Sequence, residues 1–329
     1  MDASVRVGRI AGIEIGLNWS LAIVFLLIVW TLAGQVLPSV APGQQQSAYW
    51  LVSVIAVVLF YVSLLSHELG HAIVARRLGV KVDGITLWIF GGVARLRGDA
   101  ATPGTEVKIA IAGPLVSLAL SILFGAATFA LDATGGPVLV EGGIAWLAGT
   151  NAMLLLFNLI PAFPLDGGRL LRAWLWQRSG DRYRATSGAA RLGRICAFLM
   201  IGLGLLSLLI NGGLSGLWLI FLGWFLQSAA RSEESQVLMR GALSGLLVED
   251  VMSRDLTTAR VRDVGTGLDE VARAAPGEPV TEVLDRLSGA AGGQILVIDG
   301  GELVGLLSPS DIARALRGNQ PPDGKRTTV

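Results

Sequence analysis

The chain of 329 residues is strongly apolar, with 52% hydrophobic and only 16% charged residues and a mean hydropathy of +0.62. A soluble domain carries about 25% charged residues, so the composition excludes a soluble globular enzyme, a disordered protein and a nucleic-acid-binding protein. The formal net charge of +1 indicates no partner of either sign. The single cysteine, Cys196, excludes an intrachain disulfide.

Long apolar stretches predict an α-helical integral membrane protein with six transmembrane helices. Each stretch holds about 17–27 mostly apolar residues, which is enough to cross ~30 Å of hydrocarbon, and a helix satisfies its own backbone hydrogen bonds there. The apolar core of the first stretch is too long for a cleavable signal peptide. The six predicted spans are 17–37, 49–75, 106–131, 142–162, 190–210 and 214–230.

Lys and Arg are distributed unevenly over the loops that join these spans. The loops 38–48, 132–141 and 211–213 contain neither residue, whereas 76–108 and 163–194 are basic. Because cytoplasmic loops carry an excess of Lys and Arg, we expect a cell-membrane protein whose two termini and two basic loops face the cytosol. The basic residues of these loops are Arg76, Arg77, Lys81, Arg95, Arg97 and Lys108, then Arg169, Arg172, Arg178, Arg182, Arg184, Arg191 and Arg194.

The composition changes after the predicted membrane domain, which we assign to residues 1–230. Residues 231–246 are polar, contain Gly and Ser and predict a linker, and 247–317 predict a small cytosolic α/β domain. The last residues, 318–329, are expected to be disordered. Within the small domain, hydrophobic periodicity predicts helices at 279–287 and 310–316 and strands at 294–298 and 303–307.

The chain has only two histidines, His67 and His71, and Glu68 lies between them in the pattern H-E-x-x-H. On a helix, residues i and i+4 share one face, so both imidazoles can hold one metal ion, and Glu68 can reach a water there as a general base. Two nitrogen ligands suit Zn²⁺. The alternative is a helix whose polar residues face a bundle interior, but ionisable residues within a span are rare and mark function. The pattern therefore predicts one zinc ion per chain.

A hydrolytic zinc site has three protein ligands, and a carboxylate must supply the third because the chain has no third histidine. The best candidate is Asp166, near the cytosolic end of the fourth predicted span, where Pro161 and Pro164 break the helix. Non-helical backbone is tolerated at membrane depth where it lines a site within the protein. Alternatively, Asp166 is only the N-cap of the next helix, expected at 168–176. Because the two-histidine site still lacks a third ligand, we favour the interpretation of Asp166 as a metal ligand.

The position of the first histidine along its helix predicts the depth of the site. His67 lies nine residues before Arg76, which we expect at the cytosolic interface. Roughly 13 Å of helix therefore separates the two residues. We expect the zinc ion to lie in the cytosolic half of the bilayer.

Together these motifs resemble the site-2 protease family of intramembrane zinc metalloproteases. H-E-x-x-H lies in a predicted span, and N-x-x-P-x-x-P-L-D-G-G, from Asn158 onward, lies at the end of a later one. The resemblance implies that His67, His71 and Asp166 bind zinc, that Glu68 activates water, and that Asn158 helps to hold the substrate backbone or oxyanion. The implied activity is an endopeptidase that cleaves a transmembrane segment of a substrate protein, in regulated intramembrane proteolysis.

Three further segments bear on this resemblance. Residues 80–96 resemble the family's membrane-associated β-hairpin, whose exposed edge can capture an unwound substrate by β-addition; a plain connecting hairpin fits the same pattern. Gly113 to Ser117 matches a recurring Gly-x-x-x-small motif, which close helix packing by small residues explains equally well. Asn18, before Trp19-Ser20, departs from the family, whose members often have a histidine there, but this position is outside the implied ligand set.

The C-terminal domain resembles a cystathionine-beta-synthase-type (CBS) domain, in its opening segment 251–253 and in a G-x-x-S-x-x-D element at 305–311. In ligand-binding relatives the Ser and Asp contact the ribose of adenine nucleotides, which implies Ser308 and Asp311 as candidates. Such domains usually work in pairs, and about 70 residues are present here, so the resemblance implies a degenerate pair or a unit completed by homodimerisation. A simple helix start explains residues 308–311 as well.

Two other functions are compatible with part of this pattern. CBS-type modules also regulate transporters and channels, but a transporter predicts repeated halves with paired broken helices, and only one broken helix is apparent. An inactive scaffold would not need the complete ligand set. We therefore expect a zinc endopeptidase within the lipid bilayer, with a membrane-associated hairpin and a regulatory CBS-like domain.

Overall fold

The computed structural model of the protein describes residues 4–89, 91–97, 100–211, 215–254, 272–290 and 293–318. The chain divides into two compact units, Met1–Glu233 and Glu234–Val329. The tail predicted at 318–329 lies outside the described residues except for Gly318, and so do residues 255–271 of the predicted α/β domain.

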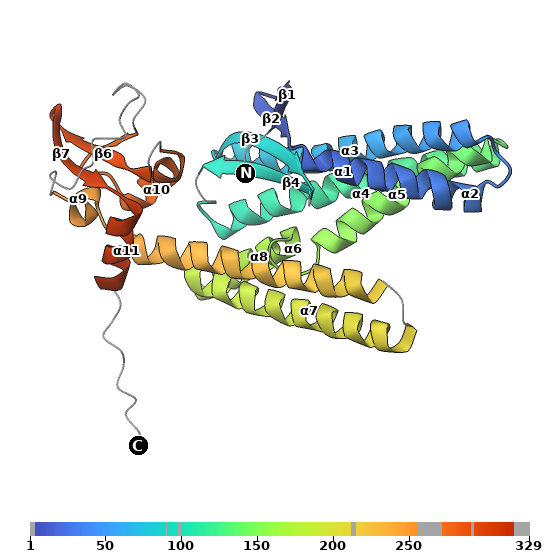
Figure 1. Cartoon of the computed structure of the whole chain (residues 1–329). Coiled ribbons are helices and arrows are strands. Elements are labelled where there is room, and N and C mark those ends of the chain that lie inside the picture. Colours follow the sequence, from blue (N-terminus) through green and yellow to red (C-terminus); the bar gives the residue numbers. More distant parts are fainter. Residues whose placement is uncertain are drawn as a thin grey trace, which may run out of the picture. The chain divides into compact units, whose positions relative to one another are not determined.

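The first unit is mainly helical (Figure 1). Five of its helical stretches are long and apolar enough to cross a membrane: Ser20–Val40, Gln46–Arg77, Pro103–Ala133, Val138–Asn158 and Arg182–Ile210. They overlap the first five predicted spans, because apolar segments of this length are stable in lipid only with their backbone paired within the segment. The elements are α1 (Ser20–Thr31), the π-helix η1 (Leu32–Val36), α2 (Leu37–Val40), α3 (Gln46–Arg77), α4 (Pro103–Ala133), α5 (Val138–Asn158), α6 (Asp166–Ser179), α7 (Arg182–Asn211) and α8 (Ser215–Leu243).

Helix α8 begins where the sixth span is predicted, but it is not among the five membrane-crossing candidates. Its apolar part is short, and polar residues follow from Gln227 onward. The helix continues to Leu243, so most of the residues predicted as a linker, 231–246, are helical. This stretch is rich in Glu, Gln, Leu, Met and Arg, which have high helix propensity.

A four-stranded sheet in the order β1-β2-β3-β4 lies beside α3 (Figure 1). Strands β1 (Val5–Ile10) and β2 (Ile13–Leu17) form one antiparallel hairpin, β3 (Lys81–Trp88) and β4 (Gly91–Arg97) form a second, and β2 pairs with β3 in parallel. The sheet packs on α3 through a shared apolar cluster, so it is fixed to the helix that carries both histidines. The buried members of this cluster are Ile13, Ile15, Leu64, Ala72, Ile85 and Leu87.

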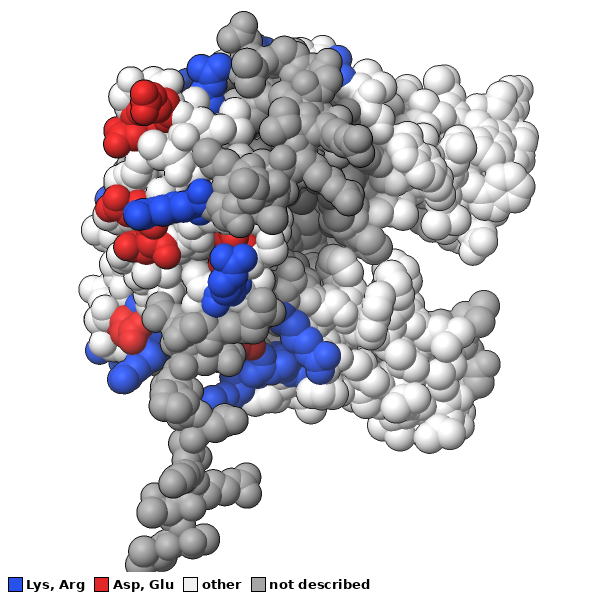
Figure 2. Space-filling model, turned by 60° about the vertical axis from the view of Figure 1, so that its left-hand side comes forward, with Lys and Arg blue, Asp and Glu red and all other residues white. Residues whose placement is uncertain are grey.

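Helix α4 is central to the unit, because it makes extensive contacts with α3, α5 and α6. Figure 2 shows a face on which the projecting helical parts of the first unit carry no visible Lys, Arg, Asp or Glu side chains. Many large apolar side chains on these helices are exposed, among them Leu26, Trp30, Ile122, Phe129 and Leu209. Such a surface is unfavourable in water and suits a lipid environment.

The second unit is a small α/β module with a three-stranded sheet in the order β5-β6-β7. Strand β5 (Arg273–Ala274) pairs in parallel with β6 (Ile295–Asp299), which pairs antiparallel with β7 (Glu302–Leu307). Both predicted strands and both predicted helices of this domain are present close to their expected bounds. The helices are α9 (Val248–Val251), α10 (Val280–Gly289) and α11 (Pro309–Gly318), and the core is made of residues such as Val248, Val283, Ile295, Val297, Leu307 and Ile312.

Candidate metal centre

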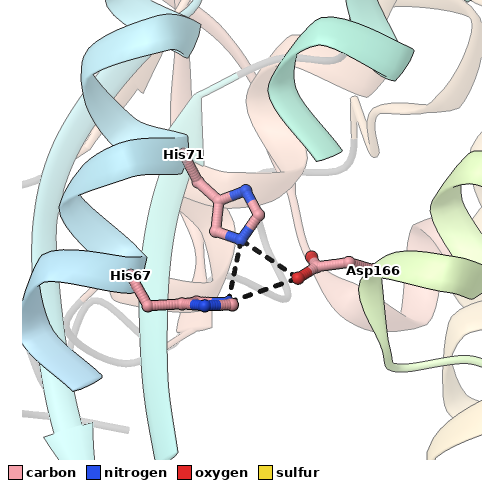
Figure 3. Close-up of side chains that lie close together, drawn as sticks. All are labelled: His67, His71 and Asp166. Carbon is pink, nitrogen blue, oxygen red and sulfur yellow. Dashed lines mark hydrogen bonds and ion pairs between the residues drawn. The ribbon is translucent and has the colours of Figure 1, made fainter. Parts of the chain in front are cut away.

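The imidazoles of His67 and His71 are buried side by side on one face of α3, one helical turn apart (Figure 3). Their residues are only 2% and 6% exposed. The spacing of four residues produces this arrangement on a helix. Burial of two polar rings in an apolar bundle is costly unless their nitrogen atoms have partners, so the atoms around them define the site.

A turn between two helices brings the third candidate to these rings. Helix α5 ends at Asn158, and the chain turns through residues 159–165 before α6 begins at Asp166. Pro161 and Pro164 prevent a continuous helix because proline lacks the backbone N–H. Asp166 is therefore the first residue of α6, and the fourth span ends at Asn158 instead of residue 162 as predicted.

The first turn of α6 packs directly on the preceding chain. A Cβ at Gly168 would meet backbone atoms of Ala162 and Phe163 at 2.7 Å, so only glycine allows this approach. Leu165 is the N-cap residue of α6, and no side chain caps the helix there. The Asp166 carboxylate is consequently not engaged as an N-cap and is available to the two histidines.

The three side chains place one ligand atom each around a common point (Figure 3). His71 Nε2 lies 3.2 Å from His67 Nε2 and 3.2 Å from Asp166 Oδ2, and His67 Nε2 lies 3.3 Å from the same oxygen. Ligand atoms bonded at ~2.0–2.1 Å to one tetrahedral zinc ion are separated by about 3.3 Å. The donor set and its spacing therefore fit a zinc ion.

The other ring nitrogens are bound by α4, which fixes the orientation of both imidazoles. His71 Nδ1 lies 2.7 Å from the carbonyl oxygen of Ile109, and His67 Nδ1 lies 2.8 Å from Ser117 Oγ. A carbonyl only accepts hydrogen bonds, so Nδ1 of His71 carries a proton, and in the neutral ring Nε2 then presents a lone pair to the common point. Partners of this kind orient metal-binding histidines and set their tautomer.

Gly113 of α4 provides the space for the two rings. A Cβ at this position would overlap Nε2 of both His67 and His71. The glycine thus lies directly against the point at which the three ligand atoms converge. An empty side-chain position here is what a buried metal ion and a fourth ligand require.

Glu68 lies on α3 between the histidines, next to the sheet. A Cβ at Gly92 of strand β4 would lie 2.7 Å from Glu68 Cδ, so the strand backbone passes against the carboxyl group. The hairpin of β3 and β4 therefore borders the metal centre on the side of Glu68.

The remaining predicted site residues have other contacts. Asn158 is partly buried at the end of α5, and its amide donates to the carbonyl of Leu154 at 3.0 Å. In the second unit, Asp311 Oδ2 accepts hydrogen bonds from the backbone N–H of Ser308 at 3.0 Å and from its hydroxyl at 2.5 Å. These last contacts are those of a helix start, as the alternative interpretation of residues 308–311 predicts.

Sequence reasoning did not assign the partners that hold the histidines. The spacing of Gly113 and Ser117, four residues apart, was the available signal, since both lie on one face of a helix. By itself this spacing predicts a family motif or close helix packing, and neither assigns the contacts with the histidines. The Ile109 carbonyl and the approach of Gly92 have no sequence signal, because they depend on backbone atoms.

Comparison with known proteins gives two family matches. The profile described as Peptidase family M50 matches residues 55–136 and 131–202, and the CBS domain profile matches residues 248–318. The chain is 38% identical over 368 residues to "Putative zinc metalloprotease Rip3" of Mycobacterium tuberculosis (strain H37Rv), covering 96% of this chain and 93% of that protein.

Two relatives come from Methanocaldococcus jannaschii. "Zinc metalloprotease MJ0392" is 30% identical over 96% of this chain and 97% of its own length. The solved structure "Site-2 Protease from Methanocaldococcus jannaschii" is 32% identical, with a TM-score of 0.47 over 70% of this chain and 94% of that chain. The nearly full-length Mycobacterium relative decides the assignment. This multi-pass membrane protein belongs to peptidase family M50, the site-2 protease family of zinc metalloproteases, and carries a CBS domain.

Proposed function

We propose that His67, His71 and Asp166 hold the zinc ion of this metalloprotease and that Glu68 is its general base. The observation that carries the proposal is the triangle of Nε2, Nε2 and Oδ2 atoms, with sides of 3.2–3.3 Å. Helix α4 supports the proposal because it fixes both imidazoles with these atoms facing one another.

The reaction is hydrolysis of a peptide bond in a transmembrane segment of a substrate protein. A zinc ion held by the three ligands would supply Lewis-acid chemistry at this point, for the scissile carbonyl and for a water molecule near neutral pH. The Glu68 carboxylate takes that proton as water attacks the carbonyl carbon, and then delivers it to the leaving amine nitrogen.

The substrate must be unwound before it can react, because a helix keeps its carbonyl groups in its own hydrogen bonds. Strand β4 is the terminal strand of the sheet, and it passes against Glu68 at Gly92. We infer that this membrane-associated hairpin pairs with the extended substrate by β-addition. Asn158 would contact the substrate backbone or oxyanion after its amide leaves the Leu154 carbonyl.

The topology follows from the charges of the loops. The proposal is a cell-membrane protease with six spans, the sixth within α8, and with both termini and both basic loops in the cytosol. The zinc ion would then lie in the cytosolic half of the bilayer. Residues 1–230 would form the protease domain, 231–246 the segment joining it to the CBS domain at 247–317, and 318–329 a disordered tail.

We further propose that the CBS domain regulates proteolysis. Its ligand would be an adenine nucleotide held near Ser308 and Asp311, and a single CBS unit would be completed by a second copy of the chain in a homodimer. Equilibrium dialysis of the full-length protein with ATP, and its molar mass in detergent at several concentrations, test these two points. No ATP binding and a constant monomer mass would each contradict the corresponding part.

The central test compares the purified full-length protein with Glu68→Gln in detergent. Both proteins should contain zinc, because Glu68 is outside the ligand set, and only the wild type should cleave a transmembrane substrate. A third protein, Asp166→Ala, should contain neither zinc nor activity. Cleavage by Glu68→Gln would refute the proposed role of Glu68. Absence of zinc from both the wild type and Glu68→Gln would refute the metal centre and favour a transporter or scaffold.

A further inference from the structure

A buried ion pair links α4 to α6 close to the metal centre. Arg172 Nε donates to Glu106 Oε1 at 2.8 Å, and a second guanidinium N–H, from Nη2, donates to the same oxygen. Both residues are enclosed by the protein: Glu106 is 0% and Arg172 is 6% exposed. Neither residue belongs to the predicted ligand set or to the proposed reaction.

On the α4 side, the pair continues the face that holds the histidines. Glu106, Ile109, Gly113 and Ser117 are spaced by three, four and four residues and are all buried, so they lie along one face of the helix. Ile109 and Ser117 bind the two Nδ1 atoms, and Gly113 accommodates the rings. Glu106 is one turn before Ile109 and is directed to α6 instead.

On the α6 side, the pair acts on the helix that begins with Asp166. Arg172 follows Asp166 by six residues, which is roughly 9 Å along the helix. Its guanidinium also lies over the ring of Phe163, 5.3 Å from the ring centroid. Phe163 is 1% exposed and belongs to the turn that precedes Asp166. Arg172 therefore contacts both α4 and the turn that precedes Asp166.

We propose that Glu106 and Arg172 are positioning residues that hold the Asp166 carboxylate at its distance from the two imidazoles. One face of α4 thus fixes the positions of all three proposed ligands. It contacts the rings of the two histidines directly, and it holds α6, which carries Asp166, through the Glu106–Arg172 ion pair. This inference rests on the proposed zinc site. It goes beyond that site in naming the residues that fix the geometry of its third ligand.

Stability alone is a poor explanation for this pair. A buried ion pair usually adds no more stability than apolar residues of the same volume, because both charges lose their hydration. The second carboxylate oxygen, Glu106 Oε2, is buried and has no hydrogen-bond partner among the described residues. Two N–H groups of the rigid, planar guanidinium instead converge on one carboxylate oxygen and so fix the direction of Arg172 as well as its distance, which a metal ligand on a separate helix requires.

The test uses full-length Arg172→Met and Glu106→Gln, with Arg172→Lys as the conservative variant. Arg178→Met is the matched control, since Arg178 is exposed on the same helix and lies over Trp174 at 4.1 Å. The readouts are the zinc dissociation constant, from competition with a chromophoric chelator, and the visible spectrum of the Co²⁺-substituted protein. Both report the ligand geometry without any cleavage assay.

We expect Arg172→Met and Glu106→Gln to weaken zinc binding by about 10- to 100-fold, as loss of a supporting residue does at other metal sites, and to change the Co²⁺ spectrum. Arg172→Lys should lie between these variants and the wild type. Arg178→Met should match the wild type. With a transmembrane substrate, kcat should fall more than KM rises, because Asp166 contacts the metal and not the substrate.

A folded Arg172→Met with unchanged zinc affinity and an unchanged Co²⁺ spectrum would overturn the inference. If Arg172→Met does not fold, Arg172→Lys and Glu106→Gln decide the question by the same two readouts. Equal effects from Arg178→Met would also overturn it, because they would reveal a general response of α6. Failure of the proposed function is distinct: it appears as a wild-type protein without zinc or as an active Glu68→Gln protein.

Discussion

The Nδ1 atom of His71 donates its proton to the backbone carbonyl of Ile109 across 2.7 Å. The acceptor is a main-chain atom of α4, so no side-chain substitution removes it directly. This contact leaves the Nε2 lone pair of His71 facing His67 and Asp166. The tautomer of one proposed zinc ligand is therefore set by the packing of α3 against α4, and the neighbouring contact at Ser117 is the one that mutation can test.

Ser117→Ala removes the partner of His67 Nδ1, which lies 2.8 Å from the serine hydroxyl. The ring then loses its orienting bond, and we expect zinc affinity to fall by about 10- to 100-fold. Chelator competition measures the change. The control is Ser121→Ala, one turn further along α4, whose hydroxyl donates to the Ala148 carbonyl at 3.0 Å and not to a histidine. Equal losses in both variants would contradict a specific role for Ser117.

Gly113→Ala places a methyl group where both Nε2 atoms lie. The rings cannot keep their positions, and we expect the purified protein to contain almost no zinc. Metal analysis of the purified protein, with circular dichroism to verify that it is folded, measures this. In Gly125→Ala, on the same helix, the added methyl group meets no atom within 4 Å. This control should retain its zinc and gain up to about 1 kcal/mol from the higher helix propensity of alanine. Zinc in Gly113→Ala at the wild-type level would contradict the proposed centre.

The convergence of His67, His71 and Asp166 was predictable because ionisable side chains are rare in apolar spans. His67, Glu68 and His71 occur within five residues of an apolar span, where ionisable residues mark function. Asp166 was predictable by elimination, since few carboxylates lie at membrane depth and two prolines break the chain before it. The contacts of the histidines with Ile109 and Ser117 were not predictable, because they depend on how α3, α4 and α6 pack against one another.

The four-stranded sheet was only partly predictable from the sequence. The hairpin of β1 and β2 was missed, although its sequence alternates apolar and polar residues on either side of Ala11-Gly12. Both turn residues have positive φ, 50° and 76°, as a two-residue hairpin loop requires. Such loops usually have Asn or Asp at the first position, and Ala11 at this position does not indicate a hairpin turn. The parallel pairing of β2 with β3 joins segments that are separated by α1, η1, α2 and α3, and no local pattern contains that information.

Asp311→Ala tests the helix-start interpretation in the second unit. The Asp311 carboxylate accepts from the backbone N–H and the hydroxyl of Ser308, and loss of such a capping side chain costs about 1–2 kcal/mol. Amide hydrogen exchange in α11, measured on the full-length protein, should accelerate by about 5- to 30-fold. Ser310→Ala is the control, because Ser310 contacts only the Ser308 hydroxyl among the described contacts. Unchanged exchange in Asp311→Ala would show that the carboxylate does not hold the helix, and would favour its availability to a ligand.

Gly92→Ala tests whether strand β4 positions Glu68. The added Cβ would lie 2.7 Å from Glu68 Cδ, which is closer than van der Waals contact, so either the carboxyl group or the strand must move. A displacement of about 1 Å in a catalytic group can cost 100-fold in rate, and we expect a loss of about this size in kcat for a transmembrane substrate. Zinc content should stay at the wild-type level, because the three atoms nearest to a Cβ at Gly92 all belong to Glu68, which is outside the proposed ligand set. Loss of zinc together with activity would place the effect on the metal ligands, and full activity would show that Glu68 keeps its function without the close approach of the strand.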